Sequence, residues 1–168
     1  GDHYINDELV QRLRESGWQT YTTSNHNSRF LRILDMIWTI FTKRKAYQLA
    51  EVDVFSGAAF IWAEISINLL HYLEKPVILT LHGGNLPQFA QKNQGRVAKL
   101  LKLASTVITP SHYLFEEFRT RCRNIQIIPN PIDIERYSFR QRNTLAPNLI
   151  WLRAFHEIYN PSLAPQIL

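Results

Sequence analysis

Short β-branched runs that alternate with longer amphipathic segments constrain the fold of this chain more than any other feature. The clearest run, Val77–Leu81, is bounded by Pro76 and by Gly83 and Gly84, which predicts a buried strand that ends in an open loop. The other predicted strands are 18–23, 52–56, 106–109, 125–128 and 149–152, and the predicted helices are 4–16, 29–41, 57–73, 94–104 and 112–120. The alternation predicts an α/β fold with a doubly wound and mainly parallel sheet.

The same pattern divides the chain into two parts. Residues 1–130 are predicted to form one domain, 131–148 to form a linker that begins and ends near prolines, and 149–168 to begin a second domain. A helix that leads directly into a strand implies a preceding parallel strand. We therefore expect the first strand of the sheet to lie upstream of Gly1.

His82 follows the strand at 77–81 directly and precedes two glycines. In open α/β sheets, ligands bind beyond the carboxyl ends of the strands, and glycines allow the backbone to approach a ligand closely. His82 is therefore a candidate reaction site. The alternative is a simple turn in which the histidine only ends the strand, and the residues alone leave both interpretations open.

Ser111 follows Pro110 at the start of the helix predicted at 112–120. The favoured interpretation is that its hydroxyl caps the helix by accepting a hydrogen bond from a free backbone N–H group. The alternative is that the same helix start holds a phosphate.

The composition is that of a soluble globular protein, with 45% apolar and 20% charged residues. The formal net charge of +5 favours anionic partners such as nucleotide-sugars, phospholipid headgroups or nucleic acid. There is no zinc-type spacing of Cys and His and no nucleic-acid-binding signature, so no nucleic-acid partner and no metal site is expected. The single cysteine, Cys122, fits a reducing compartment and favours the cytoplasm.

The segment 29–45 combines a wide apolar helical face with basic residues around it. We favour a helix that covers the sheet, because every α/β layer needs such a face. The alternative is a basic amphipathic helix that lies on an anionic membrane surface, which would make the protein peripheral to the membrane.

Three segments, in order and spacing, resemble the acceptor-side domain of the family 4 glycosyltransferases. They are Leu79-Thr80-Leu81-His82-Gly83-Gly84-Asn85, then 107–114 with Pro110-Ser111, and then Ile127-Ile128-Pro129-Asn130-Pro131-Ile132-Asp133 with Arg136-Tyr137. Residues 152–161 resemble, more loosely, the first strand and loop of that family's donor-side domain.

The resemblance implies a GT-B enzyme, in which two Rossmann-like domains face each other across a cleft. Such an enzyme moves a sugar from a nucleotide-sugar donor to a glycan or lipid-linked acceptor, without a metal ion or other cofactor and usually with retention of configuration. By this resemblance His82 is the catalytic histidine near the transferred sugar, and Gly83, Gly84, Asn85 and Ser111 bind substrate. By the same resemblance Arg153 binds the donor diphosphate, because an arginine fork meets phosphate oxygens in pairs. His156, three residues after Arg153, is expected to reach the same diphosphate-binding site.

The sequence also departs from the family's pattern. Leu152 stands where a glycine is usual, and the donor-side pair of glutamates has no counterpart here. We therefore expect this chain to be part of a longer enzyme and to be inactive by itself, with bacterial polysaccharide synthesis as the setting that the resemblance suggests. A non-catalytic α/β module that binds a small anion or a nucleotide is the alternative.

Overall fold

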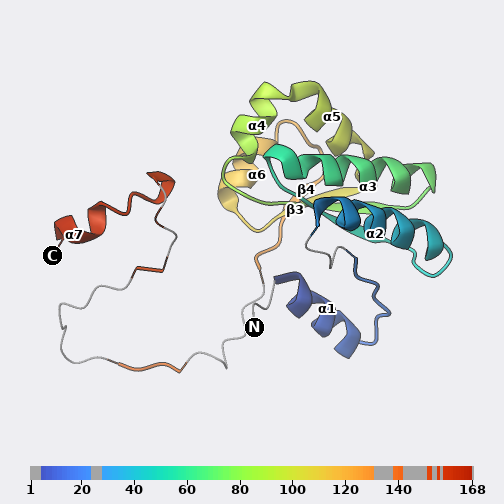
Figure 1. The fold of residues 1–168 in the computed structure, drawn as a ribbon, viewed down its shortest axis with the longest axis horizontal. Coiled ribbons are helices and arrows are strands. Elements are labelled where there is room, and N and C mark those ends of the chain that lie inside the picture. Colours follow the sequence, from blue (N-terminus) through green and yellow to red (C-terminus); the bar gives the residue numbers. More distant parts are fainter. Residues whose placement is uncertain are drawn as a thin grey trace. The chain divides into compact units, whose positions relative to one another are not determined.

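In the computed structural model, residues 1–131 contain a four-stranded parallel sheet (Figure 1). The structure describes residues 5–23, 28–130, 138–141, 151–152, 155 and 157–167. The strands are β1 (Ala50–Val54), β2 (Val77–Leu81), β3 (Thr106–Thr109) and β4 (Ile125–Ile127), and they lie side by side in chain order. This arrangement, with helices between the strands, confirms the predicted Rossmann-like α/β class.

Helices connect and flank these strands. They are α1 (Ile5–Glu15), α2 (Arg29–Thr42), η1 (Gly57–Ala59), α3 (Phe60–Tyr72), α4 (Leu86–Lys92), α5 (Gln94–Leu103) and α6 (His112–Phe118). Residues 1–131 and 132–168 form two separate compact units, and the described elements of the second are η3 (Glu157–Tyr159) and α7 (Leu163–Ile167).

The hydrophobic core lies against one face of the sheet. Val52 of β1, Leu79 of β2 and Val107 of β3 are in register, so their side chains share this face, and each is at most 8% exposed. Helix α3 packs against β1 and β2 through buried residues at helical spacing, among them Phe60, Ala63, Ile67 and Leu70. Right-handed crossovers between neighbouring parallel strands in chain order place their helices on one side of the sheet, which accounts for the one-sided core.

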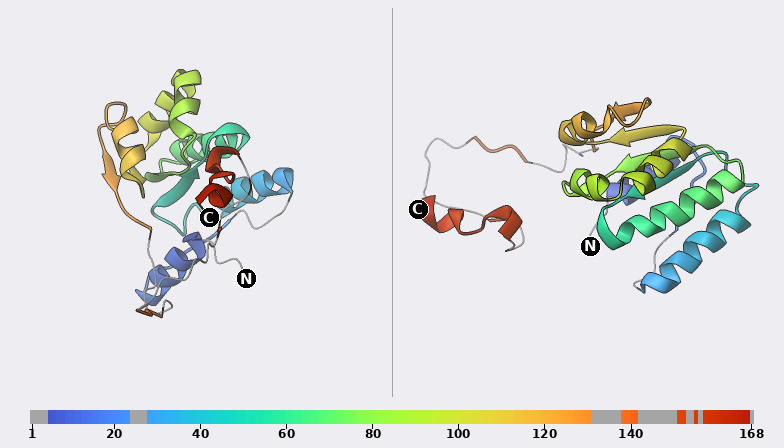
Figure 2. Two further views of the ribbon diagram at one scale, coloured as in Figure 1. Left: turned by 90° about the vertical axis from the view of Figure 1, so that its left-hand side faces the viewer. Right: turned by 90° about the horizontal axis from the view of Figure 1, so that it is seen from above.

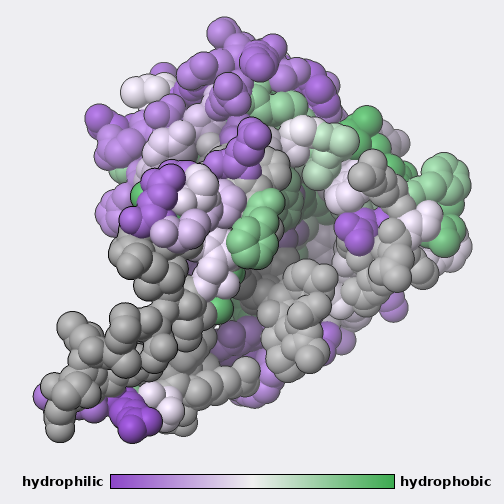
Figure 3. Space-filling view, turned by 60° about the vertical axis from the view of Figure 1, so that its left-hand side comes forward, coloured by the Kyte–Doolittle hydropathy of each residue, from purple (hydrophilic) through white to green (hydrophobic). Residues whose placement is uncertain are grey.

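Helix α2 packs beside α3 in the same helical layer (Figure 2). Of its apolar residues only Ile40 joins the core, and several others face outward. Figure 3 shows hydrophobic side chains gathered along the right-hand edge of the surface in that view.

The strand predicted at 18–23 is wrong. These residues pair with no strand among the described parts of the chain, and their side chains bond to the neighbouring helices instead. Thr20 accepts a hydrogen bond from Arg14 of α1 at 2.7 Å, and Thr23 donates one to Asp35 of α2 at 2.9 Å. An alternating pattern therefore does not make a strand where no backbone partner is available.

Helix α4 lies between the predicted strand at 77–81 and the predicted helix at 94–104, where no helix was predicted. Pro87 lies in the first turn of α4, where a helix tolerates proline because the missing N–H group would have had no partner. Of the strand predicted at 149–152, residues 151 and 152 carry no strand, and the other two lie outside the described residues.

Candidate functional site

His82 and the groups around it lie at the carboxyl edge of the sheet. His82 follows the last residue of β2, and its backbone N–H donates a hydrogen bond to the carbonyl oxygen of Val54 at 2.9 Å. This bond continues the pairing of β1 with β2 by one residue and fixes where the imidazole leaves the sheet. The side chain of His82 is 17% exposed, so one part of the ring is accessible.

Two residues from the end of β1 hold the imidazole. The Nε2 atom of His82 lies 2.7 Å from the Oδ1 atom of Asp53, and the ring of Phe55 stacks on the imidazole with centroids 5.0 Å apart and an interplanar angle of 15°. An ionised carboxylate only accepts hydrogen bonds, so Nε2 carries the hydrogen in this pair. The Nδ1 atom is the ring nitrogen that takes no part in this pair.

The loop after His82 exposes its backbone. Gly83 has a φ of +87°, which other residues adopt only under strain. A Cβ atom at Gly83 or Gly84 would meet no described atom within 4 Å, and Gly83, Gly84 and Asn85 are all exposed. Asn85 is the N-cap residue of α4, and its side chain makes no capping hydrogen bond. The loop therefore offers the open backbone that close approach of a ligand requires.

Ser111 lies two residues after the end of the neighbouring strand β3. Its hydroxyl accepts a hydrogen bond from the backbone N–H of Leu114 at 3.5 Å, which confirms the predicted capping of α6. Because β2 and β3 are parallel neighbours, Ser111 and the loop of His82 leave the sheet at the same edge. A role of Ser111 in substrate binding stays a prediction.

The sequence interpretation missed Asp53 and Phe55. Parallel neighbouring strands bring their carboxyl ends together, so the end of β1 lies beside the end of β2. An acidic and an aromatic residue at the end of the strand before His82 were the available signal. Arg153 and His156, predicted to bind the donor diphosphate, lie outside the described residues.

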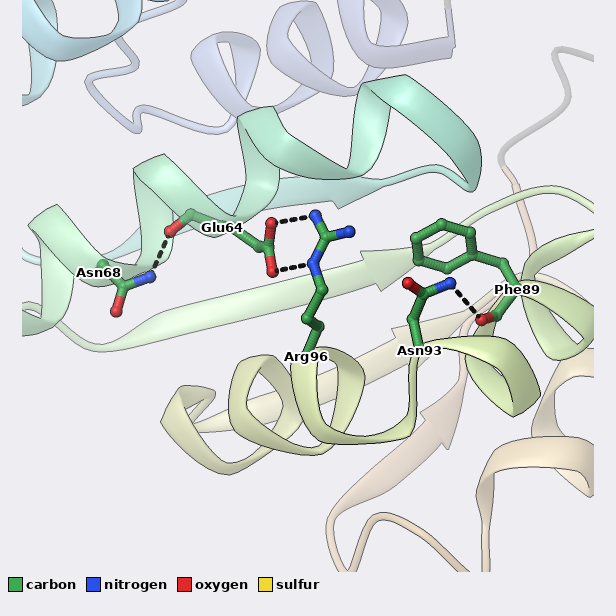
Figure 4. A network of polar contacts seen from close by, with 5 residues as sticks. All are labelled: Glu64, Asn68, Phe89, Asn93 and Arg96. Atoms are coloured by element: carbon green, nitrogen blue, oxygen red, sulfur yellow. Dashed lines mark hydrogen bonds and ion pairs between the residues drawn. The ribbon is translucent and has the colours of Figure 1, made fainter.

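A second polar network lies away from this edge and joins α3 to α5 (Figure 4). The Nε and Nη2 atoms of Arg96 donate to the two carboxylate oxygens of Glu64 at 2.9 and 2.5 Å, and these bonds raise the pKa of the guanidinium above its ordinary value. The guanidinium also lies 5.4 Å from the ring centroid of Phe60. A hollow between α3 and α5 includes both charged residues but not His82, so we assign this network to helix packing.

Within the described residues no three His, Cys, Asp or Glu side chains cluster as metal ligands would, and no helix is long and apolar enough to cross a membrane. Neither observation identifies the reaction.

Comparison with known families identifies the chain. Residues 6–136 match Glycosyltransferase Family 4. The chain belongs to this family. The match covers the whole described sheet and the carboxyl edge that carries His82, and it supports a glycosyltransferase-type function with a sugar donor and an acceptor as partners. A search of curated proteins finds no match.

Proposed function

We propose that residues 1–131 form the acceptor-side part of a glycosyltransferase that uses a nucleotide-sugar donor and a glycan or lipid-linked acceptor. The single observation that carries this proposal is the position of His82 and the contacts that hold its side chain. His82 extends from the carboxyl edge of a parallel sheet, is held by Asp53 and Phe55, and adjoins an exposed glycine loop. A side chain fixed in this way loses little freedom when a sugar binds, which favours the transition state.

In the proposed reaction the bond between the anomeric carbon and the diphosphate breaks, the acceptor hydroxyl oxygen bonds to the anomeric carbon, and the hydroxyl proton passes to the leaving diphosphate. Negative charge develops on the leaving diphosphate and has to be met by cations or N–H donors. We assign this role to Arg153 and His156, and we place the sugar against His82 and the backbone of Gly83 and Gly84. The reaction is proposed to need no metal ion and to retain the configuration of the sugar.

The role of Asp53 follows from the same geometry. By accepting from Nε2 it orients the ring and selects which nitrogen faces the substrate. Asp53 is thus a positioning residue in this proposal, and His82 is the residue that touches the sugar.

The test is a His82→Ala variant in the longest form of the protein that the gene encodes. Nucleotide release is measured over a panel of nucleotide-sugars with lipid and glycan extracts as acceptors. We expect the turnover to fall by about 100-fold or more, a loss of about 2.7 kcal/mol of transition-state stabilisation.

His71→Ala is the matched control, because His71 is an exposed histidine of α3. It should keep the turnover of the wild type. Equal turnover of the His82→Ala protein and the wild type, with circular dichroism showing both folded, would refute the proposal. Nucleotide binding without any turnover in the wild type would favour the non-catalytic binding module instead.

A further inference from the structure

The outer face of α2 carries a stripe of large apolar side chains that nothing in the described chain covers. Phe30 and Trp38 are 69% and 71% exposed, and the other members are between one third and one half exposed. The stripe consists of Phe30, Leu31, Leu34, Ile37, Trp38 and Phe41, which recur at helical spacing, and most of them line one shallow hollow. Soluble proteins rarely expose a continuous apolar patch of this kind unless it binds something.

A basic cluster lies at the carboxyl end of this stripe. It consists of Lys43, Arg44 and Lys45, which follow α2 directly. The guanidinium of Arg44 lies 4.2 Å from the ring centroid of Phe41, and the ammonium of Lys43 lies 5.4 Å from that of Tyr21. Cations are thus held in contact with aromatic rings at the boundary of the apolar surface.

Three hydrogen bonds fix the turn that carries the basic cluster. Arg44 donates to the carbonyl oxygen of Phe41 at 2.7 Å, and the hydroxyl of Tyr47 donates to that of Ile40 at 3.0 Å. The ammonium of Lys75, from beyond α3, donates to the carbonyl oxygen of Tyr47 at 2.9 Å. The cluster and the stripe therefore form one preformed surface.

The charges of this segment decide whether a second copy of the chain or an anionic surface fits the stripe better. Asp35 is the acidic residue between residues 28 and 45, and its carboxylate accepts a hydrogen bond from Thr23. Basic residues occur at both ends of the helix. A second copy packed on the stripe would bring basic residues near basic residues in either orientation of the two helices. An anionic surface complements these charges, and a bilayer also accepts the apolar stripe, with Trp38 at the level of the headgroups.

We propose that the outer face of α2 and the basic cluster dock on an anionic lipid bilayer. The axis of α2 lies in the plane of the membrane, because the stripe runs along its length. The apolar side chains enter the boundary between headgroups and acyl chains, and Lys43, Arg44 and Lys45 face the lipid phosphates. The proposal is independent of the transfer reaction.

The test is flotation of the whole chain with vesicles of phosphatidylcholine alone and with vesicles that also contain phosphatidylglycerol. We expect binding to the anionic vesicles only, and weaker binding at high salt. Each basic residue near a membrane surface contributes about fivefold in affinity, so Lys43→Gln with Lys45→Gln should weaken binding by about 30-fold. Trp38→Ser should weaken it by about tenfold or more, because the apolar area that the membrane buries is lost.

The matched control is Lys99→Gln with Lys102→Gln, which removes the same charge from exposed positions of α5. It should bind like the wild type, and so should His82→Ala, which separates this proposal from the catalytic one. Equal binding to neutral and anionic vesicles, or no flotation of the folded wild type, would overturn the proposal. It would also be overturned if light scattering showed a dimer that Trp38→Ser converts to a monomer, since the occupant would then be a second copy.

Discussion

The bond between Asp53 and His82 allows the sharpest test of the site that does not require a known substrate. We consider the variants Asp53→Ala and His82→Ala and the protein that carries both. Asp53 has further interactions, and His82 also stacks on Phe55, so each single variant loses more than the bond itself. A double-mutant cycle cancels these other losses and leaves the coupling between the two side chains.

The structure sets the size of this coupling. Hydrogen bonds to charged groups contribute about 1.5–3 kcal/mol when they are buried, and exposed ion pairs contribute about 0.2–1 kcal/mol. The bond is short, at 2.7 Å, and the side chains of His82 and Asp53 are 17% and 24% exposed. The pair is thus intermediate between the two classes, and we expect a coupling of about 1–2 kcal/mol.

The free energies of unfolding of the four proteins are measured by urea denaturation at one pH and one salt concentration. The pair of Glu8 and Arg12 on α1, whose closest atoms lie 2.9 Å apart and whose side chains are 25% and 49% exposed, is the control cycle and should give about 0.3–0.5 kcal/mol. A coupling between Asp53 and His82 below about 0.3 kcal/mol, the usual error of additivity, would refute the view that the carboxylate holds the imidazole.

Three further predictions concern the packing around the sheet. Phe60→Ala should lower the free energy of unfolding by about 3–5 kcal/mol, because Phe60 is fully buried with its ring centroid 4.9 Å from that of Phe89; a loss below about 1 kcal/mol in urea denaturation would contradict this. Glu64→Gln should lower the midpoint of thermal unfolding at low salt, since it breaks a bidentate but partly exposed pair, and the loss should shrink at high salt; an unchanged midpoint at low salt would count against it. Burial raises the pKa of Tyr47 above 10.0, so the unfolded chain ionises first as the pH rises, and the free energy of unfolding should fall above about pH 10. The free energy of unfolding of Tyr47→Phe should lack this part of the decline. In denaturation experiments from pH 8 to 11, the difference in free energy of unfolding between the wild type and Tyr47→Phe should therefore shrink as the pH rises.

Local patterns were enough to predict the centre of the fold. The strands at 77–81 and 106–109 agree with β2 and β3 residue by residue, because β-branched runs bounded by proline, glycine or serine indicate both where a buried strand begins and where it ends. Ser111 could be assigned to capping for the same reason: the cap depends only on residues within one turn. The segment at 18–23 failed because a strand also needs a partner, which no local pattern supplies.

The candidate site shows the same limit. His82 and its glycines are adjacent in sequence and could be recognised together. Asp53 and Phe55 are more than twenty-five residues away from them along the chain, and they contact His82 only because β1 and β2 pair in parallel with the register Val54↔Leu81. Such residues become predictable once the strand order and register are known.

The order of the strands also has a consequence for how the protein folds. In this sheet each strand pairs with the next strand of the chain, so every pairing closes only one helix-containing connection. Loop closure costs less entropy for short connections, and contacts between near segments favour fast folding. We therefore expect the sheet to grow one strand at a time as the ribosome delivers the chain, with β1 and β2 able to pair, and Asp53 able to meet His82, before β4 is synthesised.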